Sequence, residues 1–573
     1  MADKQPLLVA HSEAKELSHL NDHDLSALES HSTASAAAAR QRRRQVARRV
    51  HLAGLLLLAA GFYTYAVGLP SLASALFRWT GAYPHDHNGS DGFVRTGSTP
   101  LEGPLTLPDS LQCVLPEGSS EPFTYPLAQY VLTFDHDHSL SVLQNASRHM
   151  VLPDDPSDGD DDDTGKLYWQ HVHTTGEVVV RKTVDGKEPS VEVEAVSNDE
   201  RIRIQVAFDD DAQRLSVVVD ERIRVEREHW RGDRGACLVV RVTVWVPAAH
   251  LETLRVGAVH LGVRLLEDLD LVVDDAARLT SVAGRIVAAQ TLEGSAVGKP
   301  GSSRNGKKHC TDVESLLTYR PDYRFEATSL DVVTTSGSIQ GPWSLLDRLH
   351  IASVSGTVGV AVRVLGEEKD HKDLADLRIE TVSGTIGLEE VKDDNGGSAP
   401  RPHRLGLFTK SGTIHGSGSF AESGHVNSVS GNVAVALTPR KLAADSSSSS
   451  GGGGRAKLDV STVSGKTVVY LLQEAQNEPI DFLDSSHHAV SGTILLHYPS
   501  SWVGDIHMET LSGRLAVEGK GVHVVPDKSP SWPPKIRRKV DAVKESLDGK
   551  DSGRQSSLQV DTVSGSVKLI FPE

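Results

Sequence analysis

The 573-residue chain is poor in aromatic residues and in cysteine, and both shortages limit the folds that it can adopt. Aromatic residues make up 5% of the sequence while glycine occurs 50 times, a balance that favours strands and turns over a helical bundle. Three cysteines cannot all pair within the chain, so the fold does not depend on a disulfide framework. The sequence does not choose a pair among Cys113, Cys237 and Cys310, and three buried thiols are an equal alternative.

The chain also lacks an excess of positive charge and the local motifs of the common enzyme classes. The formal net charge is −17, so we expect no nucleic-acid partner. The sequence contains no Gly-x-Ser-x-Gly elbow, His-Glu-x-x-His pair, phosphate loop or dinucleotide fingerprint. We therefore predict a protein without catalytic residues and without a cofactor.

One short phrase recurs through the C-terminal half: usually an apolar residue, then Ser-Gly, any residue, and Val, Ile or Leu. Its glycines are Gly337, Gly356, Gly384, Gly412, Gly431, Gly465, Gly492, Gly513 and Gly565. In the copy around Gly356, apolar residues alternate at Leu349 and Ile351 and then step by three to Val354. Alternation is typical of a strand with one buried face. The step of three predicts a bulge or corner, after which the apolar side chains again point to the buried side. We expect the glycines to point inward, where neighbouring backbones approach closely, and Ser and Thr to face outward.

Repetition at a spacing of tens of residues predicts a solenoid, because one unit buries its apolar face only against its neighbours. An ordinary sandwich with repeated strand sequences is the alternative. We predict an all-β fold in which a β-solenoid spans residues 276–573 and an antiparallel β region over 121–275 caps its first rung.

Three insertions interrupt the predicted rungs. Two of them, at 392–403 and 441–455, are rich in polar residues or glycine and are expected to be flexible loops. The third lies near 526–556. Within it, apolar residues recur at helical spacing after a Pro pair, so we predict a short amphipathic helix over Pro534–Gly549.

The repeats carry a family resemblance. Thr-Val-Ser-Gly-x-Ile copies, preceded by a strand such as Val242–Pro247, resemble the putative-adhesin family of β-solenoid domains found in bacteria and fungi. The resemblance covers residues 240–573 and implies a surface or envelope solenoid whose activity is mostly unassigned, with no catalytic residues to carry over. Large insertions and an N-terminal anchor set this chain apart from simpler members and suggest a membrane-anchored, fungal form.

An apolar run without charge, Leu52–Leu69, is long enough to cross a bilayer about 30 Å thick. We predict a transmembrane helix at 50–77 between a disordered cytosolic tail at 1–49 and a stalk at 78–120. A cleaved signal peptide is the alternative, although its apolar region would be shorter and nearer the N-terminus. Basic residues concentrate before the run, which places the N-terminus in the cytosol and makes the protein type II. They are Arg40, Arg42, Arg43, Arg44, Arg48 and Arg49.

Short motifs on either side of the anchor agree with this topology. Asn88 and Asn145 each begin an N-glycosylation sequon and both follow the anchor. In the tail, Asp3, Leu7 and Leu8 match the acidic dileucine pattern that clathrin adaptors read. This motif predicts routing to endosomes or the vacuole; without it we expect the cell surface.

Several polar segments carry residue types that can bind a metal ion. The acidic run at 154–163 lacks the spacing of an EF-hand, and Asp268 and Asp270 resemble a glycosyltransferase metal pair outside the expected α/β context. Three segments place histidines at alternate positions, which share one face of a strand. They are residues 85–87, 135–138 and 171–173. Exposed polar residues explain all of these, and we predict no metal.

Together these features predict a type II single-pass membrane protein that displays a β-solenoid as a binding or structural module on the lumenal or extracellular side. The expected partners are the lipid bilayer, through residues 50–77, and a glycan or protein ligand on the solenoid surface. One alternative is a polysaccharide-active β-helix enzyme, which requires carboxylates or arginines clustered on one solenoid face. Another is a sorted component of endosomes or the vacuole.

Overall fold

The structure is a computed structural model, and all the residues that it describes lie in the second of two compact units, Met1–Asp86 and His87–Glu573. The predicted tail, membrane helix and most of the stalk fall outside the described residues, as does Cys310. No helix within the described part is long and apolar enough to cross a membrane. The described residues are 104–108, 113, 115, 121–133, 139–147, 167–184, 186–226, 235–247, 249–290, 323–366, 374–391, 401–442, 455–474, 478–526, 538–546 and 555–572.

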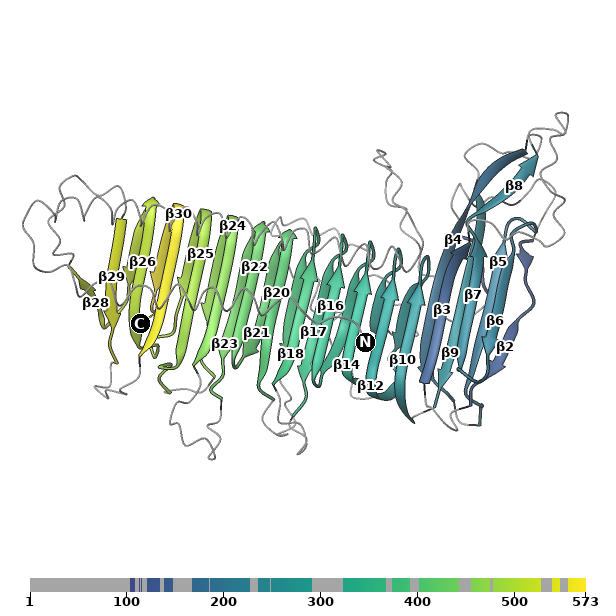
Figure 1. Cartoon of the computed structure of the whole chain (residues 1–573), viewed down its shortest axis with the longest axis horizontal. Helices are drawn as coiled ribbons and strands as arrows, with labels where there is room; N and C mark the ends of the chain where they lie inside the picture. The colour runs from purple at the N-terminus through teal and green to yellow at the C-terminus, as the bar shows by residue number, and fades with distance from the viewer. Residues whose placement is uncertain are drawn as a thin grey trace, which may run out of the picture. The chain divides into compact units, whose positions relative to one another are not determined.

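All the regular secondary structure in the described part is β-strand, which confirms the prediction of an all-β fold. From β10 to β22 the chain alternates between two parallel ladders, because each strand pairs with the strand two positions further along the sequence (Figure 1). We call ladder A the strands before each Ser-Gly corner and ladder B the strands after it.

The strands of each ladder follow in chain order. Ladder A contains β10 (Ala249–Ala258), β12 (Asp270–Ser281), β14 (Arg324–Thr334), β16 (Arg348–Ser353), β18 (Ala375–Thr381), β20 (His403–Ser411), β22 (Ser423–Ser430) and β26 (Gly504–Ser512). Ladder B contains β11 (Gly262–Leu266), β13 (Ile286–Gln290), β15 (Ile339–Leu345), β17 (Val358–Val364), β19 (Ile386–Val391), β21 (Ile414–Phe420), β23 (Val433–Pro439) and β27 (Leu515–Glu518). Three longer strands run through the corner and belong to both ladders: β24 (Ala456–Leu471), β25 (Leu483–His497) and β30 (Ser556–Ile570).

The ladders begin on strands of mixed direction. These are β1 (Phe123–Thr124), β2 (Ala128–Val131), β3 (Ser139–Ser147), β4 (Leu167–Lys182), β5 (Ser190–Ser197), β6 (Ile204–Asp209), β7 (Arg214–Asp220), β8 (Arg222–Glu226) and β9 (Ala236–Val246). The antiparallel pairing expected over 121–275 occurs between β5 and β9 and between β6 and β7, but β3 pairs in parallel with β10 and β4 with β11. The first rungs therefore have parallel templates, and antiparallel strands lie beyond them, where they cover the edge.

One disulfide reinforces this N-terminal region. Cys113, in the segment predicted as a stalk, is bonded to Cys237 near the start of β9, 124 residues further along the chain. The sequence alone left this pair undecided.

The C-terminal strand β30 is inserted out of chain order. It pairs with β25 on one side and with β26 and β27 on the other, so the segment between β25 and β30 forms the last rung (Figure 1). The outer edge of β26 is then covered by β29 (Arg538–Lys544), which runs antiparallel and pairs in turn with β28 (Val522–Val525).

The helix predicted over Pro534–Gly549 is therefore wrong for the residues that the structure describes there. Val540 and Ala542 lie at alternate positions of β29, and both contribute to the apolar core. The edge of β26 offers a row of unpaired backbone groups, and pairing with it outweighs the helical spacing of a few apolar residues.

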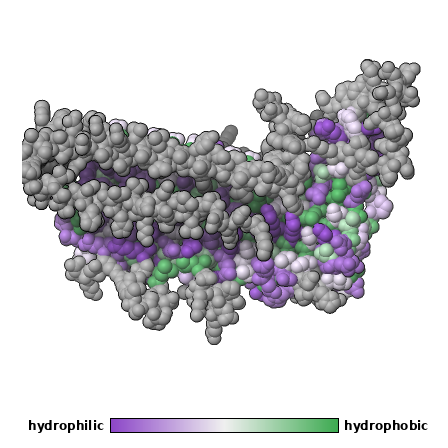
Figure 2. Space-filling view, viewed as in Figure 1, coloured by the Kyte–Doolittle hydropathy of each residue, from purple (hydrophilic) through white to green (hydrophobic). Residues whose placement is uncertain are grey.

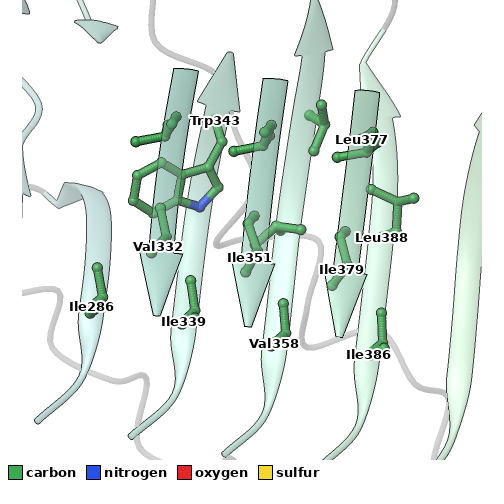
Figure 3. Packing of buried hydrophobic residues seen from close by; sticks show 14 of the residues in the cluster. Ile286, Val332, Ile339, Trp343, Ile351, Val358, Leu377, Ile379, Ile386 and Leu388 are labelled. Carbon is green, nitrogen blue, oxygen red and sulfur yellow. The ribbon is translucent and has the colours of Figure 1, made fainter. Parts of the chain in front are cut away.

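The core lies between the two ladders and consists of aligned rows. In ladder B, Ile286, Ile339 and Val358 stand in register on successive strands, all fully buried (Figure 3). In ladder A, Val332 and Ile351 form a matching row (Figure 3). Because parallel in-register strands place like residues above one another, branched side chains of similar shape pack without voids.

The corner differs from its predicted form by one position. Ser353, not Val354, continues the buried alternation after Ile351, so the step of three runs from Ser353 to Gly356. The residue before Ser-Gly faces outward, and in three late copies it is 44–48% exposed. Those copies are Val490, Leu511 and Val563.

Hydrogen bonding explains why Ser353 is buried and Val354 is not. The hydroxyl of Ser353 accepts a bond from the N–H of Gly356 at 2.9 Å and donates one to the carbonyl of Gly337, on the preceding rung, at 3.3 Å. Thr334 makes the same two bonds, to the N–H of Gly337 and the carbonyl of Gly284. A buried hydroxyl thus forms hydrogen bonds with backbone N–H and carbonyl groups of the corner.

The glycines of the phrase stand directly against one another. A Cβ atom built on Gly356 would lie 1.7 Å from the carbonyl oxygen of Gly337, and one on Gly384 would lie 1.8 Å from that of Gly356. Such contacts connect a column of glycines from rung to rung. In spatial order the column is Gly284, Gly337, Gly356, Gly384, Gly412, Gly431, Gly465, Gly492, Gly565 and Gly513.

Replacing Gly356 by Ala should destabilise the protein by about 3 kcal/mol, because the new methyl group meets backbone that cannot move without shifting a rung. Gly359 is the matched control, since a Cβ there has no atom within 4 Å. Urea unfolding of the full chain in detergent would compare both variants with wild type. Equal midpoints for Gly356→Ala and Gly359→Ala would contradict the close contact.

Candidate functional site

The outer face of ladder A carries histidines that lie against carboxylates on neighbouring strands. Parallel in-register pairing, or antiparallel pairing in the case of β29, brings each histidine and its carboxylate directly opposite one another. The pairs and their N···O distances are His350–Asp331 at 2.7 Å, His425–Asp459 at 4.0 Å, His488–Asp561 at 3.5 Å and His507–Asp541 at 2.7 Å. In Figure 2, hydrophilic residues form a band along the described strands. This face is charged, whereas we expected mainly Ser and Thr on the outside.

The pair at His350 is the most enclosed. Its other ring nitrogen contacts Glu380 at 3.1 Å, and Arg378 donates to that same carboxylate at 2.6 Å. Burial alone would lower the pKa of His350, but hydrogen bonds and charge from Asp331 and Glu380 outweigh it and raise the pKa to about 9.

The two carboxylates respond in the opposite direction. Burial would raise the pKa of Asp331 and of Glu380, but their hydrogen bonds to His350 hold both below the usual range. The three groups therefore form a closed ionic network near neutral pH. A histidine that stays protonated there is a poor general base.

A second group of residues gathers near the end of ladder A, and we call it the distal cluster. It consists of His507 and Glu509 on β26 and Asp561 on β30, whose ligand atoms all lie within 4.8 Å of one another. His507 and Glu509 are two residues apart and share one face of their strand. Asp561 lies opposite Glu509 in register. Among the described residues, this is the group whose donor types suit a metal ion.

Sequence reasoning missed the distal cluster. Glu509 and Asp561 come together only because β30 is inserted beside β26, a strand order that no local pattern reveals. The one available signal was His507-x-Glu509, which places two ligand types on one strand face.

An aromatic pair lies on the outer face of ladder B. The rings of Tyr470 on β24 and His497 on β25 stack with centroids 4.6 Å apart and planes 12° apart. On the other side Tyr470 pairs in register with Ala436 of β23, which is too small to cover the ring. Tyr470 is 43% exposed. An open aromatic face of this kind can pack against a flat apolar surface of a ligand.

The predicted site residues are placed only in part. Asn145 is exposed on β3, as a glycosylated residue must be. Asn88, the sorting residues Asp3, Leu7 and Leu8, and the arginines at 40–49 lie outside the described residues.

Of the segments considered as candidate metal sites in the sequence, the structure describes only residues 171–173 and the Asp268–Asp270 pair. His171 and His173 are exposed on β4, and Asp268 lies 3.6 Å from Arg181, in an ion pair. Residues 85–87, 135–138 and 154–163 lie outside the described residues.

Comparisons with known proteins return adhesin-type structures at low similarity. No protein-family model and no curated protein matches the chain. One solved structure that does match is a "putative cell adhesion protein" from Clostridium sporogenes, with 5% identity over 79% of this chain and 100% of the other, at a TM-score of 0.12. Another is a "putative adhesin" from Parabacteroides distasonis, with 9% identity over 57% of this chain and 98% of the other, at a TM-score of 0.18. Because both TM-scores are below 0.5, we infer neither fold nor function from them.

The His350 network predicts a pH-dependent stability. Because its pKa is raised from 6.5 to about 9 on folding, the stabilisation is complete below pH 6.5 and is lost as the pH rises through 9. We expect the difference in unfolding free energy between wild type and His350→Gln to shrink by about 3 kcal/mol from pH 6 to pH 10.

Urea unfolding at both pH values measures this difference. His425→Gln is the control, since this half-exposed histidine lies 4.0 Å from Asp459 and should change stability little at either pH. If the difference in unfolding free energy between wild type and His350→Gln did not change with pH, folding would not raise the pKa of His350.

Proposed function

We propose that the chain is a type II single-pass membrane protein that displays a β-solenoid as a non-catalytic binding module on the lumenal or extracellular side. The observation that carries the proposal is the uncovered ring face of Tyr470 on an otherwise regular outer sheet face. This ring lies on the outer face of ladder B and is not part of the hydrophobic core. An aromatic side chain held in the open by a rigid ladder is suited to contact a ligand.

The solenoid interpretation is supported by the pairing of the strands. Two parallel ladders share one core, and the same corner hydrogen bonds recur at Ser353 and Thr334. In a sandwich, sequence neighbours would not return to the same register after every second strand.

Three features support the topology and the compartment. The apolar run Leu52–Leu69 follows the arginine cluster, and the sequon residue Asn145 is exposed. The Cys113–Cys237 disulfide fits an oxidising compartment, which the lumenal or extracellular side provides. Routing to endosomes or the vacuole through Asp3, Leu7 and Leu8 is part of the proposal, with the cell surface as the other destination.

A glycan is the ligand class that this surface fits best. One face of a sugar ring consists mainly of C–H groups and packs on an aromatic ring such as that of Tyr470, whose uncovered face lies on the side of Ala436. A protein ligand is the other outcome of the test described below.

A polysaccharide-active enzyme is a second candidate, because the outer face of ladder A does carry carboxylates. Glu380 is buried, and Asp331 is partly exposed. Both are bound to His350, however, and a carboxylate held ionised by a cation is a weak proton donor toward a glycosidic oxygen.

Binding of the full chain in detergent to a panel of immobilised neutral and acidic polysaccharides tests the proposed function. We expect at least one to bind, and Tyr470→Ala to weaken the affinity about tenfold, the loss of one good stacking contact. Trp169→Ala is the control, because that exposed ring lies on β4 under Arg224.

Each outcome decides between the candidates. Equal binding by wild type and Tyr470→Ala would remove the aromatic face from the site, and no polysaccharide binding at all would favour a protein ligand. Release of reducing sugar ends by the wild-type chain would favour the enzyme.

The topology has its own test. Treatment of the protein from eukaryotic cells with an N-glycosidase should increase its gel mobility, because Asn145 is exposed and both sequons follow the anchor. The shift should be lost in the double variant Asn88→Gln, Asn145→Gln. A wild-type protein whose mobility does not change would contradict the lumenal placement.

A further inference from the structure

We propose that the distal cluster binds one divalent transition-metal ion, with Zn²⁺ preferred, through His507, Glu509 and Asp561. The three ligand atoms lie within 4.8 Å of one another. Around a tetrahedral zinc ion with bonds of about 2.0 Å, ligand atoms are separated by about 3.3 Å. These side chains lie at the surface, so small rotations of their outer bonds can close the remaining gap.

The Nδ1 atom of His507 already has the kind of hydrogen-bond partner that a metal-bound histidine has. Its Nδ1 contacts a carboxylate oxygen of Asp541 at 2.7 Å, and Lys539 holds Asp541 at 2.9 Å. This leaves Nε2 of His507 to face the ion. A carboxylate behind a histidine fixes the ring and its tautomer, and such pairs are usual behind zinc-bound histidines.

Asp561 is oriented in a similar way. Gln559 donates to one of its carboxylate oxygens at 2.6 Å, and Nδ1 of His488 lies 3.5 Å from that same oxygen. The other oxygen can then bind the ion. His488 is itself held by Ser486, which contacts its Nε2 at 2.6 Å.

The donor set selects the class of metal. Imidazole with two carboxylates suits Zn²⁺ and related ions, whereas Ca²⁺ takes six to eight oxygen ligands and Mg²⁺ prefers carboxylates and water. Glu509 and Asp561 also stand directly opposite each other on neighbouring strands, so both carboxylates are within reach of one ion.

The position of the site gives it a structural consequence. Asp561 belongs to the inserted C-terminal strand β30, and its two partners belong to β26 of the last rung. A bound ion would connect these strands through side chains, in addition to their backbone hydrogen bonds. This role is independent of glycan binding at Tyr470, which lies on ladder B.

Isothermal titration of the metal-stripped full chain in detergent with Zn²⁺ tests the proposal. We expect Glu509→Gln and Asp561→Asn to lose one equivalent of Zn²⁺ relative to wild type, or to bind it at least tenfold more weakly. His425→Gln is the matched control, because its pair with Asp459 has a similar surface position but no third ligand in the described cluster.

A second measurement guards against variants that fold poorly. Zn²⁺ should raise the midpoint of thermal unfolding in wild type and His425→Gln by several degrees more than in Glu509→Gln, each shift being measured against the same variant without metal. Identical Zn²⁺ titrations for wild type and Glu509→Gln would overturn the proposal. So would tighter binding of Ca²⁺ or Mg²⁺ than of Zn²⁺.

Discussion

The structure depends on the contact between glycine backbones at the corner. Each glycine lies so close to the carbonyl of the preceding one in the column that a single methyl group has no room, as at Gly356 against Gly337. A buried hydroxyl, such as that of Ser353, binds the backbone groups on both rungs at this point. Since the corner fixes where each strand starts, it also fixes the register of both ladders and therefore the rows of the core.

The register in turn determines the surface. Once strands are parallel and in register, residues far apart in sequence become direct neighbours, as His425 and Asp459 do. Charged pairs on ladder A and the aromatic pair on ladder B are both products of this alignment. The same regularity that builds the core thus offers binding groups at fixed intervals of about 4.8 Å.

The sequence predicted the strands and the inward glycines because alternation and the Ser-Gly phrase are local signals. The predicted position of the corner was wrong by one residue, since Val354 is apolar, as a core residue usually is, and Ser353 is not. A hydrophobic pattern does not reveal that the Ser353 hydroxyl is buried and hydrogen-bonded. The sequence predicted a helix where β29 lies, because local spacing says nothing of an open edge on β26. The distal cluster was out of reach for the same reason, since Glu509 and Asp561 meet only through strand order.

The inserted position of β30 also constrains how the chain is made. While the protein is being synthesised, β25 and β26 are complete before the strand that separates them has left the ribosome. Until then β25 presents an open parallel edge, and β26 can pair with it in the wrong place. The last rung is therefore assembled only after β30 has been made, and a chain that stops before residue 556 loses the strand that joins β26 to β25.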